Sequence, residues 1–206
     1  MCLVGFVLSK MKLLDAVSAE VQVCEKCPLS KTRKKAVPGV GSPRGRIMFV
    51  GEAPGRSEDL KGEPFVGAAG KFLDVLLSEI GLSREAVFIT NVAKCRPPHN
   101  RQPYPAEVQA CTPYLDRQIR SIRPRVIVTL GNHSTAYMLA KAGLPFDGIT
   151  LTHGKFLKVT LLGLSFTVFS TFHPAAALYN GQYKKQLIED FQTLGHEFAR
   201  RRLVEL

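Results

Sequence analysis

The sequence lacks the long apolar segments that membrane-spanning proteins need. Hydrophobic residues make up 45% of the chain, but no predominantly apolar run approaches the ~20 residues that cross a bilayer. The first ten residues, MCLVGFVLSK, have no basic start and no clear cleavage site, so they do not predict a secretory signal. We therefore expect no membrane partner. Met11 offers a second start, which would make residues 1–10 a dispensable extension.

The number of cysteines does not allow all of them to pair in disulfides within the chain. The chain has five cysteines, an odd number, and no export signal precedes them. A disulfide framework is therefore not expected, and metal binding or buried thiols become the two leading interpretations.

Acidic residues are scarce relative to basic ones. Seventeen Asp and Glu residues face 28 Lys and Arg residues, which leaves a net charge of +11. Basic side chains that neutralise phosphates release counterions, so this surplus favours a polyanionic partner such as nucleic acid. A basic surface that serves only solubility is the alternative.

Neither common nucleotide-binding glycine motif is present. Gly62 and Gly67 have the separation of a phosphate loop, but Ala68 and Ala69 stand where Lys and Ser or Thr are needed. The GEAPG segment (51–55) does not match the dinucleotide pattern G-x-G-x-x-G either. These absences argue against a zinc-stabilised hydrolase of free nucleotides.

Length and periodicity predict one α/β domain. The 206 residues suffice for one core and are too few for two ordinary domains. Apolar runs predict buried strands and alternate with helical patterns, which favours a parallel sheet covered on both faces. The expected strands are 46–50, 87–91, 125–130 and 165–170, and the expected helices are 69–80, 105–122, 133–142 and 184–201. Residues 149–162 interrupt this pattern and predict a hairpin that turns at His153-Gly154.

Polar or glycine-rich residues follow each predicted strand. The first strand runs into GEAPG (51–55), and the second ends on Asn91. The third ends at Gly131-Asn132, and the fourth leads to His173-Pro174. Because ligands of open α/β sheets bind outside the carboxyl ends of the strands, we expect these segments to line one pocket.

Three side chains near these strand ends can recognise a base or a charge. Phe65 lies in a glycine-rich loop and can stack on a flat base. Asn91 carries a donor and an acceptor on one amide and can pair with a base edge. His173 can donate a hydrogen bond to developing negative charge. Each residue also has a structural interpretation, respectively as a core anchor, a turn cap and a surface turn histidine.

Four of the cysteines have a spacing that suits a metal. Cys24 and Cys27 form C-x2-C, which brings two thiolates to one site, and Cys95 and Cys111 must approach through folding. Zinc and iron–sulfur clusters both accept four thiolates, and the spacing does not choose between them. Buried small residues are the alternative. Cys2 is left over and is not an expected ligand.

Taken together, these segments resemble the family-four uracil-DNA glycosylases, the iron–sulfur enzymes of archaea and thermophilic bacteria. The matching motifs are GEAPG (51–55), Glu58-Asp59, GEPFVGAAG (62–70), TNVAKCRPP (90–98) and HPAA (173–176). The resemblance runs from about Cys24 to the closing helix. It implies a three-layer α/β/α fold with a central four-stranded parallel sheet. It also implies monofunctional hydrolysis of the N-glycosidic bond of deoxyuridine in DNA, which releases uracil and leaves an abasic site.

The resemblance implies substrate-binding roles residue by residue. Phe65 stacks on the base, Asn91 recognises uracil, and His173 faces uracil O2. Glu58 crowds uracil C5 and so excludes the methyl group of thymine. Gly51 belongs to the same substrate-binding set.

The catalytic turn departs from the better-known family-one pattern. Ala53 stands where those enzymes place a water-orienting Asp, and the family-four pattern also has a small residue there. Ala53 is therefore assigned to substrate binding. Glu52 is the acidic residue of this turn and, with His173, the expected catalytic pair.

A uracil inside a duplex must be flipped out before it can be excised. Leu178 is the expected wedge that fills the gap, with Tyr179 beside it. Basic side chains near the mouth of the pocket are expected to hold the flanking phosphates. They are Lys94, Arg96, Arg101 and Lys155.

For the cysteines, the resemblance decides in favour of a [4Fe–4S] cluster. Its implied ligands are Cys24, Cys27, Cys95 and Cys111, and its implied role is structural. The expected partner is uracil-containing DNA, single- or double-stranded, and a sliding clamp or another repair factor is a further candidate. The expected location is the cytoplasm of a prokaryote, with the nucleoid.

Two neighbouring functions stay open at this point. A non-catalytic iron–sulfur module that binds nucleic acid would keep the cysteines and the basic surface but lose Asn91 or His173. Both are present, which favours the enzyme. A glycosylase that also removes other deaminated bases, including hypoxanthine, is not excluded by the sequence.

Overall fold

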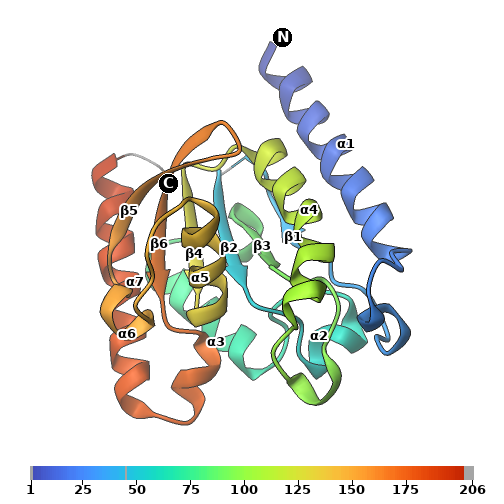
Figure 1. The fold of residues 1–206 in the computed structure, drawn as a ribbon. Helices are drawn as coiled ribbons and strands as arrows, with labels where there is room; N and C mark the ends of the chain where they lie inside the picture. The colour runs from blue at the N-terminus through green and yellow to red at the C-terminus, as the bar shows by residue number, and fades with distance from the viewer. Residues whose placement is uncertain (1, 45, 202–206) are drawn as a thin grey trace.

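A six-stranded sheet with the order β1-β3-β2-β4-β6-β5 forms the centre of the molecule (Figure 1). The computed structural model describes residues 2–44 and 46–201, with the side chains of residues 10–44 and 46–200. The strands are β1 (Val40–Gly41), β2 (Ile47–Gly51), β3 (Phe88–Asn91), β4 (Val126–Leu130), β5 (Phe156–Leu161) and β6 (Leu164–Thr171).

The four strands predicted from the apolar runs are confirmed as the parallel centre of this sheet. β2 pairs in parallel with both β3 and β4, and β4 pairs in parallel with β6. Residues of β2, β3 and β4 are buried throughout, which explains why their sequences are continuous apolar runs rather than alternating ones. The sheet has two further strands, β1 and β5, which pair antiparallel at its edges. β1 has only two residues, too few to produce a sequence pattern.

The predicted turn at His153-Gly154 is wrong. Residues Ile149–Thr152 form a short helix, α6, and the hairpin instead joins β5 to β6. Its two turn residues, Leu162 and Gly163, both have positive φ, 57° and 74°, as a tight hairpin with the twist of its strands requires. Cross-strand pairing with β6, which the local sequence does not display, decides where the hairpin turns.

Helices cover both faces of the sheet and make three layers (Figure 1). α3 (Ala68–Glu79) and α7 (Gly181–Arg201) pack against Phe49 and its neighbours on one face. α4 (Pro105–Ile122) and α5 (Asn132–Lys141) pack against Met48 and Val50 on the other. These four helices were predicted, and the three-layer α/β/α arrangement is confirmed. No helix among the described residues is both long and apolar enough to span a membrane.

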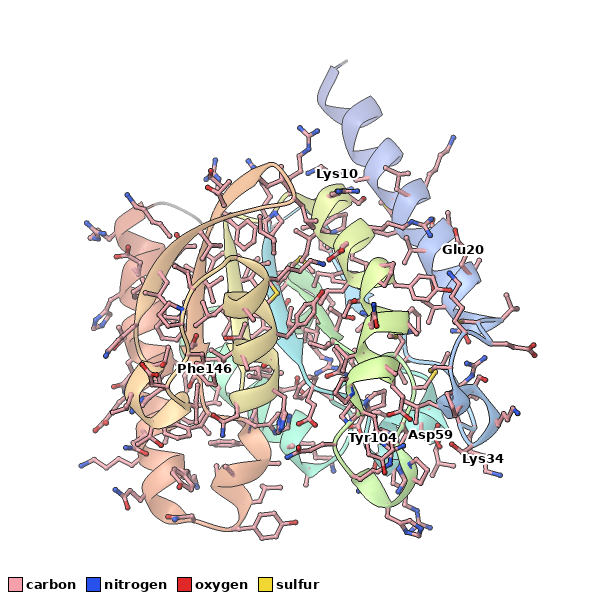
Figure 2. All side chains as sticks on the ribbon, in the orientation of Figure 1. Lys10, Glu20, Lys34, Asp59, Tyr104 and Phe146 are labelled. Carbon is pink, nitrogen blue, oxygen red and sulfur yellow. The ribbon has the colours of Figure 1, made fainter. Side chains whose placement is uncertain are left out.

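Besides α6, two helices were not predicted, α1 (Cys2–Gln22) and α2 (Arg56–Lys61). α1 lies along the outside of α4, and Figure 2 labels Lys10 and Glu20 on it. Lys10 Nζ donates to the Ile122 carbonyl at 3.0 Å, and Glu20 accepts two hydrogen bonds from Arg117. The proposed dispensable extension, residues 1–10, falls on the first half of this helix and stays a prediction. The side chain of Cys2 lies outside the described part.

Four short 3-10 segments complete the element list. They are η1 (Pro28–Lys31), η2 (Arg84–Ala86), η3 (Pro98–Asn100) and η4 (Pro174–Leu178). η3 and η4 follow β3 and β6, so both lie at the carboxyl edge of the sheet.

Candidate active site

A crevice of about 320 Å³ lies at the carboxyl edge of the central strands. The structure brings seven of the predicted residues to its walls, from segments that are far apart in the chain. They are Glu52, Ala53, Glu58, Phe65, Asn91, Arg101 and His173. The walls also include residues that the sequence did not single out for this role, namely Pro54, Gly55, Ala69, Pro97, Asn100 and Ala175.

Gly51 does not line the crevice itself, but its missing side chain leaves room for two residues that do, Asn91 and Phe65. It is paired with Asn91 across β2 and β3. A Cβ at Gly51 would lie 2.4 Å from Asn91 Oδ1 and 2.6 Å from Phe65 Cζ. Only glycine therefore allows the amide and the aromatic ring to meet above this strand end.

The amide of Asn91 has an unused acceptor. Asn91 is 2% exposed, and its Oδ1 is buried without a hydrogen-bond partner among the described residues. A buried polar atom without a partner costs about 1–3 kcal/mol. The atom is therefore poised for a donor that a bound molecule brings into the crevice.

Phe65 is held in a strained backbone conformation beside His173. Its φ is 52°, in the left-handed region that side chains with a Cβ rarely occupy. Gly70, in the first turn of α3, packs directly under it, since a Cβ there would lie 1.8 Å from the Phe65 carbonyl oxygen. The Phe65 and His173 ring centroids are 5.5 Å apart with an interplanar angle of 29°. The two rings thus border one narrow slot.

The carboxylate of Glu58 joins two loops of the crevice. Its Oε2 accepts from the Gly55 N–H at 3.1 Å, and its Oε1 accepts from the N–H groups of Val66 and Gly67, both at 2.9 Å. The catalytic turn and the Phe65 loop are therefore tied to one side chain. The next residue, Asp59, is buried and accepts from the Lys34 N–H at 2.8 Å (Figure 2), which attaches the basic loop to α2.

The imidazole of His173 is arranged as a neutral donor. Its Nδ1 accepts a hydrogen bond from the Ala175 N–H at 3.1 Å, so the ring proton must reside on Nε2. Burial lowers the pKa of His173 to about 4, and nearby Glu58 opposes this effect only in part. At neutral pH the side chain is therefore uncharged and can offer one N–H.

Glu52 forms a close pair with a histidine that the sequence did not single out. Its Oε2 lies 2.9 Å from Nδ1 of His133, in the first turn of α5. Burial raises the pKa of Glu52, while the charge and the hydrogen bond of His133 act in the opposite direction. His133 follows the strand end at Gly131-Asn132, and that position was the signal that could have identified it.

Lys94 does not face the mouth of the crevice, so its predicted role in holding phosphates is wrong. It is 1% exposed. Its Nζ donates to Thr90 Oγ1 at 2.6 Å, to the Asn91 carbonyl at 2.7 Å and to Gln118 Oε1 at 2.8 Å. These three oxygens replace the hydration of the buried ammonium group. The group in turn connects the end of β3 to α4.

The other three residues predicted to hold phosphates differ from one another in exposure and in hydrogen-bond partners. Arg101 lines the crevice, and its guanidinium pairs with both oxygens of Glu107 at 2.8 and 2.7 Å. Arg96 is half-buried and donates to Asn100 Oδ1 at 2.7 Å. Lys155 is exposed, donates to the Leu151 carbonyl and is not among the crevice residues.

The predicted wedge lies at the end of η4, five residues after His173. Leu178 is 46% exposed and Tyr179 is 90% exposed. Neither lines the crevice. The role of Leu178 as a wedge stays a prediction.

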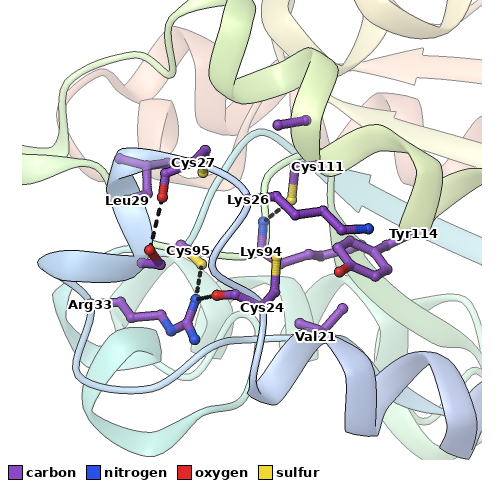
Figure 3. A pocket seen from close by; sticks show the side chains of 12 residues that line it. Val21, Cys24, Lys26, Cys27, Leu29, Arg33, Lys94, Cys95, Cys111 and Tyr114 are labelled. Atoms are coloured by element: carbon purple, nitrogen blue, oxygen red, sulfur yellow. Dashed lines mark hydrogen bonds between the residues drawn. The ribbon is translucent and has the colours of Figure 1, made fainter.

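The four cysteines of the predicted set surround one small cavity next to the crevice (Figure 3). Cys95 and Cys111 are buried, Cys24 and Cys27 are half-buried, and all four are free thiols. Arg33 Nη1 donates to Cys95 Sγ at 3.3 Å, and the Lys94 N–H donates to Cys111 Sγ at 3.1 Å.

Four thiols around one cavity are a donor set that a four-iron cluster accepts. A zinc ion needs its four sulfur ligands at about 2.3 Å from one point. Among the described residues, no group of three or more His, Cys, Asp or Glu side chains is arranged to hold one metal ion. A four-iron cluster is wider and takes one thiolate at each corner, and N–H groups directed at the sulfurs are a usual part of its surroundings.

Comparison with known proteins identifies relatives over most of the chain. The family model described as "Uracil DNA glycosylase superfamily" matches residues 38–192. The chain is 55% identical to the type-4 uracil-DNA glycosylase of Saccharolobus solfataricus over 183 residues, 88% of this chain and 85% of that protein. It is 50% identical to the type-4 enzyme of Archaeoglobus fulgidus over 185 residues, 90% and 93% of the two chains. The type-4 enzyme of Thermotoga maritima is 40% identical over 188 residues, 89% and 94%.

We predict that His173 stays neutral, with its proton on Nε2, down to about pH 5. Nitrogen-15 NMR of the imidazole should give a midpoint near 4, below the ordinary value of 6.5. Because the unfolded chain then binds more protons between these values, the free energy of unfolding should rise with pH from about 4 to 6.5 and level off above. This contribution should be absent in His173→Gln. A midpoint at or above 6.5 would contradict the assignment.

Proposed function

We propose that this chain, which belongs to the uracil DNA glycosylase superfamily, hydrolyses the N-glycosidic bond of deoxyuridine in DNA. The C1′–N1 bond breaks and its electron pair leaves with uracil. Water supplies a hydroxyl to C1′ and a proton to uracil, and an abasic site remains. The observation that carries the proposal is the buried, unpartnered Asn91 Oδ1, which shares one crevice with Phe65 and His173.

Asn91 is assigned to base recognition. Uracil N3–H is a donor that fits the unused Oδ1, and the amide NH₂ can donate to uracil O4. Cytosine presents an acceptor at N3 and a donor at N4, so both contacts would become unfavourable pairs inside a buried site. Leaving such groups unpaired discriminates strongly between substrates.

Phe65 is assigned to hold the flipped base by its face. The ring is fixed by the Gly70 contact and by the Glu58 bonds to Val66 and Gly67. A ring that is already positioned loses little conformational entropy when a base stacks on it. The slot beside His173 therefore favours a flat heterocycle.

His173 is assigned to stabilise the leaving uracil. Negative charge develops on uracil O2 as the bond breaks, and the neutral Nε2–H is a fixed donor for it. The Ala175 N–H holds the ring in this tautomer.

Glu52 is assigned to orient the attacking water, since Ala53 offers no polar group. Its carboxylate lines the crevice, and His133 holds it from the side of α5. No lysine is among the described residues that line the crevice. This supports monofunctional chemistry without a Schiff base or strand cleavage.

Uracil-containing DNA, single- or double-stranded, is the partner in this proposal. Leu178 is the side chain that fills the gap left by the flipped base. Flipping costs a few kcal/mol in lost stacking and pairing, and an inserted apolar side chain offsets part of it. The location with the nucleoid, where the substrate lies, belongs to the same proposal. A sliding clamp stays a prediction from the sequence.

Replacement of His173 by alanine tests the catalytic assignment. Loss of the donor should cost about 3 kcal/mol, roughly a hundredfold in rate, with DNA affinity almost unchanged. Single-turnover excision from an oligonucleotide with one uracil, followed by alkali to reveal abasic sites, measures it. His196→Ala, at an exposed histidine of α7, is the matched control. Full activity in His173→Ala would reject the role, and no uracil release by the natural protein would reject the function.

Glu58 has two proposed roles that one variant separates. Glu58→Ala removes the acceptor of three backbone N–H groups, so uracil excision should fall. It also opens space at C5, so excision of thymine relative to uracil should rise. Both rates are measured on matched oligonucleotides, with Glu63→Ala at an exposed neighbour as control. A fall in uracil excision without any thymine release would reject the exclusion of thymine by Glu58. Its hydrogen bonds to the two loops would then be its remaining role.

For the cofactor we propose a [4Fe–4S] cluster held by Cys24, Cys27, Cys95 and Cys111. The donor set of four free thiols around one cavity supports it. When bound, the cluster ties the segment after α1 to the loop after β3 and to α4. The chemistry it supplies is structural cross-linking.

Elemental analysis tests this proposal independently of activity. Protein purified without oxygen should contain four iron and four sulfide per chain and absorb visible light. Cys111→Ser should lose most of the iron and unfold at a lower temperature, whereas Cys2→Ser should keep both properties. One zinc per chain, with no sulfide, would contradict the assignment.

A further inference from the structure

A row of positive side chains lies at the amino edge of the sheet, opposite the crevice. It consists of Arg46, Arg123, Arg125 and Lys158, and we call it the amino-edge basic row. The first three residues precede β2 and β4, and Lys158 lies on β5. The crevice, in contrast, lies at the carboxyl ends of β2 and β3 and beyond β6.

Hydrogen bonds join the members of the row across the sheet. Arg46 Nε donates to the Arg123 carbonyl at 2.9 Å, and the Arg125 N–H donates to the Arg46 carbonyl at 2.7 Å. The Thr167 N–H donates to the Arg125 carbonyl at 3.0 Å, and Thr167 is paired with Lys158. The row therefore crosses from β2 over β4 and β6 to β5. Neighbouring strands are about 4.8 Å apart, so three steps span about 14 Å.

Within the described part of the chain, no carboxylate forms an ion pair with any member of the row. Other arginines of the chain are paired, such as Arg101 with Glu107 and Arg200 with Glu197. Like charges that gather without counter-charges destabilise the fold. Burial, and the guanidinium groups of Arg125 and Arg123, accordingly lower the pKa of Arg46.

The backbone conformation of two members of the row also destabilises the fold. Arg46 and Arg123 have φ of 54° and 51°, in the left-handed region where glycine or asparagine is favoured. Both positions nevertheless carry long cationic side chains. Such residues are typical of surfaces with a function.

A hollow of about 470 Å³ lies against the row. Its polar walls come from Arg125, Lys158, Thr160, Ser165 and Thr167. Guanidinium, ammonium and hydroxyl groups are the side-chain groups that bind phosphate oxygens in protein–DNA complexes. The hollow offers them together, without a carboxylate on its walls.

We propose that the amino-edge basic row binds the phosphate backbone of a second DNA segment, distinct from the one whose base enters the crevice. The inference rests on the proposed function, because it takes DNA as the polyanion at hand. An extended row matches a duplex, which carries one charge per about 1.7 Å of its axis, better than it matches a compact nucleotide. Because the two surfaces lie at opposite edges of the sheet, one protein molecule can bridge two DNA segments.

A capture experiment with the full chain tests this proposal. Beads carry a short duplex with a stable abasic-site analogue, which occupies the crevice, and a fluorescent duplex without uracil is added. The natural protein should capture the second duplex, and the variant Arg123→Gln/Arg125→Gln/Lys158→Gln should capture at least tenfold less. The matched control Lys31→Gln/Lys61→Gln/Lys185→Gln removes three exposed cations, which belong to η1, α2 and α7, and should capture normally.

Two further measurements separate the row from the crevice. Uracil excision from a short single-stranded oligonucleotide should stay within twofold in both triple variants, because none of the replaced residues lines the crevice. For uracil-free duplex, the slope of log Kd against log salt should become shallower by about 2–3 in the row variant, since each lost phosphate contact contributes about 0.9. Thermal unfolding verifies that both variants are folded.

Three results would overturn the inference. They are no second duplex on the natural protein, equal capture by the row variant, and displacement of the second duplex by polyglutamate but not by excess unlabelled duplex. The last result would assign the row to an acidic protein segment. Failure of uracil excision with intact capture of uracil-free DNA would instead refute the proposed function alone.

Discussion

The contact between Gly51 and Asn91 across β2 and β3 determines the shape of the crevice. Parallel pairing places the two residues side by side, and the missing Cβ of Gly51 leaves room for the amide and for the Phe65 ring. The four residues that follow β3, 92–95, reach the cysteine cavity. Lys94 Nζ holds the Asn91 carbonyl, and the Lys94 N–H is directed at Cys111 Sγ. The residue proposed for base recognition and the proposed cofactor site thus share one short segment of backbone, and a cofactor bound there would hold this side of the crevice in place.

Two titratable side chains of the crevice, His173 and Glu52, are shielded from water by burial. His173 has a depressed pKa and Glu52 a raised one, and burial is the leading cause of both shifts. Each group has one orienting partner, the Ala175 N–H for His173 and His133 for Glu52. A neutral donor and a nearby carboxylate are suited to a reaction in which negative charge develops on the base and positive charge on the sugar. The amino edge of the sheet has the opposite character, because its cations form no ion pair with a carboxylate in the described part of the chain.

Most of the candidate site could be anticipated because the carboxyl ends of parallel strands share one edge. Asn91 and His173 were named from their positions at the ends of predicted strands and Phe65 from its glycine-rich loop, and all three line one crevice. Lys94 was misplaced because sequence alone treats lysine as a surface residue, whereas three oxygens of β3 and α4 hold its ammonium group inside. His133 was missed because its partner Glu52 is 81 positions away in the chain. β1 was missed because its pairing with β3 is a long-range contact.

By itself, the sequence determined the alternation of strands and helices, the cationic character, the four-thiol set and the motifs of the superfamily. These are properties of local composition and spacing, and the chain displays them without folding. Only the tertiary structure decided which polar groups lack partners, which lysine is buried, where the hairpin turns and how six strands are ordered. Those outcomes depend on contacts between distant segments, and the free energy of burial and pairing is defined only when these segments meet. The Asn91 Oδ1, which lacks a hydrogen-bond donor among the described residues, and the cations of the opposite edge, which lack a carboxylate partner there, are both of this kind.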